Sequence, residues 1–135
     1  MPSPSVAAMA LVRRPSDGAL LVAAAPGDDF ERPLGGRVEF GERAEDAVRR
    51  EFLEEIGQPL GEVRLLAVVE NLFRVGGIDG HEVVFLFHAT LEDPKAYDIA
   101  DQGIRDHPTA DVRVTWQRPG ESGRRLVPEA ITDFL

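Results

Sequence analysis

Two short apolar runs near the start of the chain predict two β-strands. They cover residues 6–12 and 19–25, and residues 16–18 between them read Ser-Asp-Gly, which favours a turn. We therefore expect the two strands to form a hairpin. Residues 26–33 are polar and contain two prolines, which indicates a loop that leads to the glycine pair at 35–36.

A helix is predicted over residues 43–56. Gly41 is an acceptable N-cap, and acidic residues such as Glu45 in the first turn suit the positive end of the helix dipole. Gly57 followed by Pro59 is typical of a helix end.

The middle of the chain predicts a long hairpin. Residues 63–75 and 81–91 are rich in Val, Leu and Phe and flank a glycine-rich turn at 76–80. For much of their length both runs are apolar at consecutive positions, so the strands need cover on two faces.

The remaining segments predict small elements. We expect a short helix at 95–100, a last strand at 112–117 and a short helix at 128–135 that begins at a proline. Together these elements predict the α/β (α+β) class, with a mixed sheet between helices in a single domain over residues 1–135.

Composition narrows the classes of protein. The chain has 135 residues, 43% of them hydrophobic and 29% charged, which is typical of one globular domain. It has no cysteine, which excludes a disulfide scaffold, a thiolate zinc site and a cysteine nucleophile. No apolar run is long enough to span a bilayer and no basic leader precedes the first strand, so we expect a soluble, cytoplasmic protein.

The charge balance limits the partners. Asp and Glu outnumber Lys and Arg by 24 to 15, and the net charge of −9 opposes binding to nucleic acid or to an anionic membrane. We therefore expect neither partner. An anionic ligand needs help from elsewhere, most simply from a metal ion.

The predicted helix carries acids where apolar residues belong. At about 100° per residue, five apolar residues share the arc that should face the sheet: Ala44, Ala47, Val48, Phe52 and Ile56. Glu51 and Glu55 fall on this arc and Glu54 lies at its margin. Unpartnered buried carboxylates are costly and these repel one another, so the cluster indicates a bound cation, and oxygen ligands suit Mg²⁺ or Mn²⁺.

A solvated acidic helix is the alternative. In that interpretation the carboxylates pair with the arginines at 43, 49 and 50 and bind nothing. The position of Glu51 and Glu55 on the apolar arc argues against it.

The spacing around this helix carries a resemblance to a known family. Gly36, Glu42, the triplet 50–52 (Arg-Glu-Phe), the pair 54–55 (Glu-Glu) and Gly57 match the signature of the Nudix hydrolases. The hairpins before and after this box also fit that family, so the chain resembles a Nudix hydrolase over its whole length. The resemblance implies an α/β/α sandwich with a mixed sheet.

Two positions depart from the family pattern. Gln58 stands where an aliphatic residue is usual, and Pro33 precedes Leu34 where the family usually has Leu-Pro before the two glycines. Neither change removes an acid of the box.

The resemblance assigns roles to residues of the box. It implies four metal ligands: the carboxylates of Glu51, Glu54 and Glu55 and the backbone carbonyl of Gly35. Glu42 and Arg50 match the pair that holds the loop to the helix, and we expect them to support the site by charge-assisted hydrogen bonds.

The resemblance also implies the chemistry. Nudix enzymes cleave a nucleoside diphosphate linked to another moiety by attack of water at phosphorus, with a divalent metal ion that neutralises the phosphates. The predicted catalytic residues are Glu51, Glu54 and Glu55, and Glu51 or Glu54 is a candidate to accept the proton of water. Bases outside the box are equally common in the family, and five acids remain candidates: Glu70, Glu82, Asp98, Asp101 and Asp106.

The substrate is predicted only by class. Phe30 and Arg32 precede the box and are candidates to bind a small nucleotide, because an aromatic ring stacks on a base. In the family, a proline or a tyrosine some fifteen residues after the box marks enzymes for ADP-ribose or for dinucleoside polyphosphates. Here residues 71–74 read Asn-Leu-Phe-Arg. We therefore favour a nucleoside triphosphate or an oxidised nucleotide.

Several alternatives stay open. The substrate can instead be ADP-ribose, a nucleotide sugar or a dinucleoside polyphosphate, and the chain can be a nucleotide-binding module without catalysis. Residues 128–135 are too short to cover the sheet face opposite the box helix. We therefore expect that residues 95–100 or a second copy supplies the cover, and we favour a homodimer.

Overall fold

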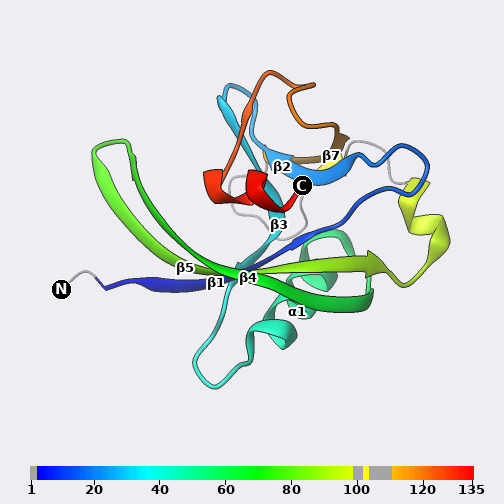
Figure 1. Ribbon diagram of the computed structural model, residues 1–135, viewed down its shortest axis with the longest axis horizontal. Helices are drawn as coiled ribbons and strands as arrows, with labels where there is room; N and C mark the ends of the chain where they lie inside the picture. The colour runs from blue at the N-terminus through cyan, green and yellow to red at the C-terminus, as the bar shows by residue number, and fades with distance from the viewer. Residues whose placement is uncertain (1–2, 99–101, 104–110) are drawn as a thin grey trace.

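A mixed β-sheet organises the molecule (Figure 1). The structure is a computed structural model and describes residues 3–98, 102–103 and 111–135. The strands run in the order β4-β5-β1-β3-β2-β7-β6, and β8 pairs with β3 beside this path. Their bounds are β1 Ser5–Leu11, β2 Leu20–Ala24, β3 Phe30–Arg37, β4 Leu60–Val75, β5 Ile78–Leu91, β6 Gln102–Gly103, β7 Arg113–Gln117 and β8 Arg125–Leu126. The parallel β1–β5 pair among antiparallel neighbours confirms the predicted α+β class with a mixed sheet.

The first hairpin differs from its prediction. Strands β1 and β2 meet only near their turn, where Arg13 bridges Leu20 and the Leu21 N–H donates to the Val12 carbonyl at 3.0 Å. Farther along, β3 lies between them and pairs with both. The loop predicted over 26–33 is therefore confirmed for residues 26–29 and wrong for residues 30–33, because β3 begins at Phe30. Prolines and charges in this segment resemble a loop, but backbone bonds from two neighbouring strands hold it extended.

The box helix is close to its prediction. Helix α1 spans Ala44–Ile56, and Gly57 ends it in the left-handed conformation at φ 70°, with its N–H donating to the Leu53 carbonyl at 3.0 Å. The predicted N-cap is wrong, because Arg43 occupies that position and Gly41 lies in the preceding turn at φ 84°. The helix lies against β3 and β1.

The long central hairpin is confirmed, with a tighter turn than the sequence predicted. Strands β4 and β5 pair antiparallel up to Val75 and Ile78, so the turn is Gly76-Gly77 alone. Both glycines have positive φ, at 59° and 79°, which suits a two-residue hairpin turn. Figure 1 shows this hairpin extending away from the rest of the sheet.

Two apolar cores lie on the two faces of the sheet. Phe52 of α1 packs into the first, and Ile131 packs into the second from the short 3₁₀-helix η2 (Glu129–Phe134). The 3₁₀-helix η1 (Pro94–Asp98) replaces the helix predicted at 95–100, whose last two residues lie outside the described ones. Among the described residues, no helix has the length and apolar character needed to cross a bilayer.

Cover of the sheet also differs from the prediction. Leu126 and Ile131 pack on the face opposite α1. The exposed apolar side chains of β4, Leu65, Val68 and Leu72, are paired with β5 residues on the α1 side. The apolar side chains that remain uncovered therefore lie along the edge strand β4.

Candidate active site

Strand β3 brings two glycines against helix α1 and strand β1. A Cβ atom on Gly36 would lie 2.5 Å from Cδ of Glu51 and 2.7 Å from both carboxylate oxygens. A Cβ atom on Gly35 would overlap the backbone of Ala8 and Met9. Position 35 therefore requires glycine, whereas a side chain at position 36 would displace the Glu51 carboxylate, which lies directly over the backbone of β3.

Glu55 is the acid of the helix that the fold buries. Its exposed fraction is 8%, and burial raises its pKa to about 8, with the nearby Glu51 carboxylate adding to the rise and the Arg32 charge opposing it. Its Oε2 atom is buried and has no hydrogen-bond partner in the described part of the chain. A buried carboxyl oxygen without a hydrogen-bond partner is uncommon, and a bound ion is one way to satisfy it.

Arg50 joins the loop to the helix. Its Nε and Nη2 donate to the two Glu42 oxygens at 2.8 and 3.0 Å, in a two-pronged pair that lowers the Glu42 pKa to about 2. Its Nη1 donates to Glu51 at 2.9 Å and to Glu54 at 3.2 Å. Nη2 also donates to the Arg37 carbonyl at 3.1 Å. The structure thus brings Glu42 and Arg50 together as the sequence predicted.

The three carboxylates do not form a finished metal cage. In the described ranges, no three of His, Cys, Asp and Glu converge on one point. Glu51 and Glu54 turn toward Arg50, and the Glu54 side chain is about half exposed. The residues nevertheless fit a divalent cation, because the donors are all oxygens, Glu55 keeps an unpartnered buried oxygen, and the glycine at 36 leaves room beside Glu51.

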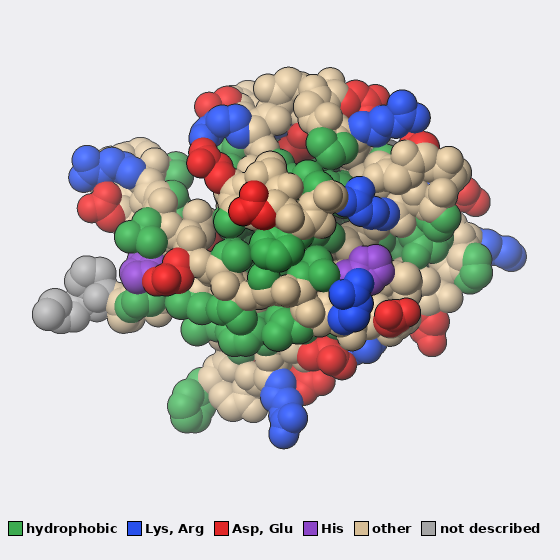
Figure 2. Space-filling view, in the orientation of Figure 1, with side chains coloured by type: hydrophobic (Ala, Val, Ile, Leu, Met, Phe, Trp, Pro, Cys, Tyr) green, Lys and Arg blue, Asp and Glu red, His purple; other side chains and the backbone are tan. Residues whose placement is uncertain are grey.

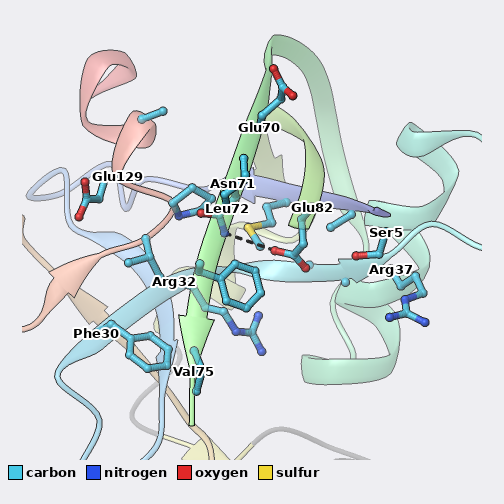
Figure 3. A pocket seen from close by; sticks show the side chains of 18 of the residues that line it. Ser5, Phe30, Arg32, Arg37, Glu70, Asn71, Leu72, Val75, Glu82 and Glu129 are labelled. Atoms are coloured by element: carbon cyan, nitrogen blue, oxygen red, sulfur yellow. Dashed lines mark hydrogen bonds between the residues drawn. The ribbon is translucent and has the colours of Figure 1, made fainter. Parts of the chain in front are cut away.

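A cavity of about 770 Å³ adjoins this site (Figure 3). Its wall includes Gly35 and Gly36. The cavity is bounded by β1, β3, the β4–β5 hairpin and residues 125–130. The two predicted substrate-binding residues, Phe30 and Arg32, both line it, although from strand β3 rather than from a loop. In Figure 2, hydrophobic side chains form a band over the sheet below the C-terminal segment.

Four arginines and three glutamates line the cavity. Arg32 and Arg37 line it and form no ion pair with any described residue, whereas Arg74 pairs with Asp79 at 2.9 Å and Arg125 lies 3.5 Å from an Asp29 oxygen. An unpaired guanidinium is a ready partner for phosphate oxygens. Sequence reasoning did not identify Arg37, because nothing in its neighbourhood along the chain distinguishes it from a surface arginine.

The acids outside the box are dispersed. Glu70 and Glu82 line the cavity, while Asp98 lies on η1 and does not line it. Asp101 and Asp106 lie outside the described residues. Glu82 accepts a hydrogen bond from the Asn71 amide at 3.4 Å, a contact that sequence reasoning missed. A signal was present, since both residues lie five positions from the glycine pair 76–77 and so face each other across the hairpin.

Carboxylates that fit a divalent cation, next to a cavity lined by arginines, are typical of hydrolases that act on phosphoric anhydrides. The NUDIX domain model matches residues 3–130, so the chain belongs to the NUDIX domain family.

Solved structures show the same fold at low sequence identity. A mutator MutT protein from Bacillus halodurans is 18% identical with a TM-score of 0.68, and the match covers 96% of this chain and 79% of that one. A NUDIX hydrolase from Nitrosomonas europaea is 20% identical with a TM-score of 0.68, over 98% of this chain and 88% of that one. A MutT NUDIX hydrolase from Burkholderia pseudomallei is 23% identical with a TM-score of 0.60, over 97% and 95%.

Proposed function

We propose that this protein is a Mg²⁺-dependent pyrophosphohydrolase, with Mn²⁺ as an alternative ion, that cleaves a nucleoside triphosphate or an oxidised nucleotide. The observation that supports it most is the unpartnered, buried Oε2 of Glu55, which lies near Gly35 at the wall of the arginine-bearing cavity. A cation beside Glu55 would favour the ionised form that burial disfavours, and a phosphate chain needs positive charge. One site meets both needs if a divalent ion joins them.

The ion would be held by the three acids of the helix and the carbonyl of Gly35. When bound, it neutralises phosphate charge and lowers the pKa of the attacking water. Arg50 keeps Glu51 oriented through its hydrogen bond of 2.9 Å, while its fork to Glu42 fixes the loop before the helix. Arg32 and Arg37 bind phosphate oxygens from the cavity side.

The chemical step transfers one proton within the site. The water oxygen forms a bond to phosphorus as the bond from phosphorus to the bridging oxygen breaks, and the water proton passes to a carboxylate. Glu51 and Glu54 are the candidates, because Glu54 is about half exposed and Glu51 is partly exposed. Both accept a hydrogen bond from Arg50, at 2.9 and 3.2 Å, which fixes the direction in which each carboxylate points.

The cavity favours a substrate of nucleotide size. A volume of about 770 Å³ lies within the range of small-molecule sites, roughly 300–1,000 Å³. Residues 71–74, where other members of the family carry the proline or tyrosine marker, line this cavity. They present neither marker, which supports a triphosphate over ADP-ribose or a dinucleoside polyphosphate. Location in the cytoplasm stays a prediction from the sequence.

A nucleotide panel tests the proposal. Purified protein is incubated with nucleoside triphosphates, oxidised nucleotides, ADP-ribose, nucleotide sugars and dinucleoside polyphosphates, with Mg²⁺, with Mn²⁺ or with EDTA. We expect release of pyrophosphate from a triphosphate that EDTA abolishes. Absence of turnover with every nucleotide would contradict an enzymatic role, and cleavage of ADP-ribose alone would contradict the substrate class.

Glu55→Gln tests the metal site directly. It keeps the shape and removes the charge, so Mg²⁺ binding should weaken and turnover should fall about 10-fold to 100-fold. Mg²⁺ should also raise the melting temperature of the wild type more than that of the variant. Glu62→Gln, an exposed acid on β4, is the matched control and should behave as the wild type. Unchanged turnover in Glu55→Gln would remove Glu55 from the site.

A further inference from the structure

Asn71 and Glu82 form a hydrogen-bonded pair in the wall of the cavity. They face each other across the β4–β5 hairpin, with the Asn71 amide donating to Oε1 of Glu82 at 3.4 Å (Figure 3). Both side chains are partly buried, and in the described ranges no cation lies within ion-pair distance of Glu82. A partly buried carboxylate with one neutral partner keeps acceptor capacity for a ligand.

The hydrogen bond fixes which groups the pair presents. An ionised carboxylate only accepts, so the Asn71 amide must direct an N–H toward Glu82. Asn71 then keeps a second N–H for a ligand, and each Glu82 oxygen has a free lone pair. The pair can therefore offer two acceptors and one donor next to one another.

Aromatic rings line the same cavity as this pair. Phe30 and Phe73 both line it, and the Phe73 ring lies over the backbone of Gly80, its partner across the hairpin. Aromatic and aliphatic walls with a few polar groups are typical of a site for a planar heterocycle. Such walls bind any base by stacking, so selectivity among bases depends on the polar pair.

The pair lies at a distance from the box along the sheet. Glu82 is paired with Ser5 of β1, whereas Gly35 is paired with Met9, four residues farther on, which corresponds to about 13 Å. If the phosphates lie at the box, as the proposed function requires, the sugar spans this gap and the base reaches Asn71 and Glu82. The inference that follows therefore rests on the proposed function.

We propose that Asn71 and Glu82 select guanine, or a base with the same 2-amino-oxo edge. Guanine presents two adjacent N–H donors followed by a carbonyl acceptor, which complements two carboxylate acceptors followed by an amide donor. Adenine and cytosine place a ring acceptor beside their amino group, which repels the carboxylate, and uracil places its N–H between two carbonyls. Glu82 thus distinguishes guanine from the other bases by the two adjacent N–H donors on one edge.

Kinetic discrimination tests this selectivity. We measure kcat/KM for GTP, ATP, CTP and UTP with Mg²⁺ for the wild type, for Glu82→Gln and for Glu62→Gln as the control on the same hairpin. The wild type should prefer GTP to ATP by roughly 5-fold to 150-fold, the range of one good bidentate base contact. Glu82→Gln, which replaces an acceptor with a donor, should abolish that preference, and Glu62→Gln should keep it.

Two results overturn the inference while the proposed function stands. One is hydrolysis by the wild type without preference for GTP, and the other is a preference that Glu82→Gln leaves intact. Circular dichroism checks that Glu82→Gln folds. If it does not, Asn71→Val replaces it, and this variant should also lose much of the preference, because the amide donor is gone. Retention of the full preference in Asn71→Val would overturn the proposal.

A binding measurement distinguishes failure of the proposed base selection from failure of the proposed catalytic function. If no nucleotide is hydrolysed, GMP and AMP are titrated into the wild type by calorimetry without metal, because neither contains an anhydride bond. Tighter binding of GMP that Glu82→Gln removes supports base selection even when catalysis is absent. Equal binding of both, or of neither, overturns it.

Discussion

The two glycine pairs of this protein serve opposite purposes. Gly35-Gly36 lies in β3, where added Cβ atoms would meet the backbone of Ala8 and the carboxylate of Glu51. Gly76-Gly77 turns the central hairpin, where added Cβ atoms would meet nothing within 4 Å and only the positive φ angles require glycine. The first pair is determined by its neighbours and the second by its own backbone conformation.

The residues around the two glycine pairs also differ. Around the first pair, Arg50 ties Glu42, Glu51 and Glu54 into one network, and Glu55 is buried. Around the second, Val75 and Ile78 are exposed at 58% and 74%. Substitutions near the box should therefore change catalysis, while substitutions in the outer hairpin turn should change stability or association.

Alanine in each glycine pair should give the largest contrast. Gly36→Ala should displace the flexible Glu51 carboxylate with little loss of stability, and turnover should fall about 100-fold, as for a catalytic group displaced by an ångström. Gly77→Ala should lower the free energy of unfolding by about 1 kcal/mol, because its φ is 79°, and should leave turnover unchanged. Thermal melts and initial rates measure both. Equal activity in the two variants would contradict the comparison.

Two arginine forks provide the next contrast. Arg50 and Arg14 each hold a carboxylate by two hydrogen bonds, but Arg14 binds Asp17 within one turn, whereas Arg50 joins the loop to the helix. Arg50→Lys should lower turnover about 10-fold, because lysine cannot reproduce the planar fork that orients Glu51. Arg14→Lys should leave turnover unchanged. Normal turnover and stability in Arg50→Lys would show that the fork does not support the site.

Acid stability should depend on the same fork. The Arg50 hydrogen bonds lower the folded-state pKa of Glu42 to about 2 from its ordinary 4.5. A lowered pKa stabilises the fold above pH 4.5, and this contribution is lost as the pH falls from about 4.5 to 2. Glu42→Gln should flatten the stability curve over that range in denaturant titrations, while Asp79→Asn at the exposed hairpin end should not. Superimposable curves for Glu42→Gln and wild type would contradict the assignment.

Weakening self-association should have the smallest effect on catalysis of the changes considered. Val68 and Leu65 on the outer edge of β4 are about half exposed, which is consistent with the homodimer that the sequence predicts. Sedimentation at micromolar concentration should detect a dimer that Val68→Ser weakens, with turnover reduced only slightly. A wild-type monomer with full activity would contradict the dimer.

Part of this fold was predictable from short stretches of sequence. Helix α1 and its glycine stop follow from a pattern within 13 residues, and the β4–β5 hairpin follows from two apolar runs around adjacent glycines. The box spacing identified the same acids that the structure groups around Arg50 and Gly36. These features depend on contacts between residues that are near in sequence, so a local pattern is enough to determine them.

The tertiary structure decided the rest. Residues 30–33 read as a loop, and they become part of strand β3 because β2 and β8 pair with them. The sequence placed three acids on one helix, but only the fold distinguishes buried Glu55 from half-exposed Glu54. The cavity joins β3, the hairpin and residues 125–130, which no local pattern connects. Burial and strand pairing depend on partners distant in sequence, and a pattern along one segment carries no record of them.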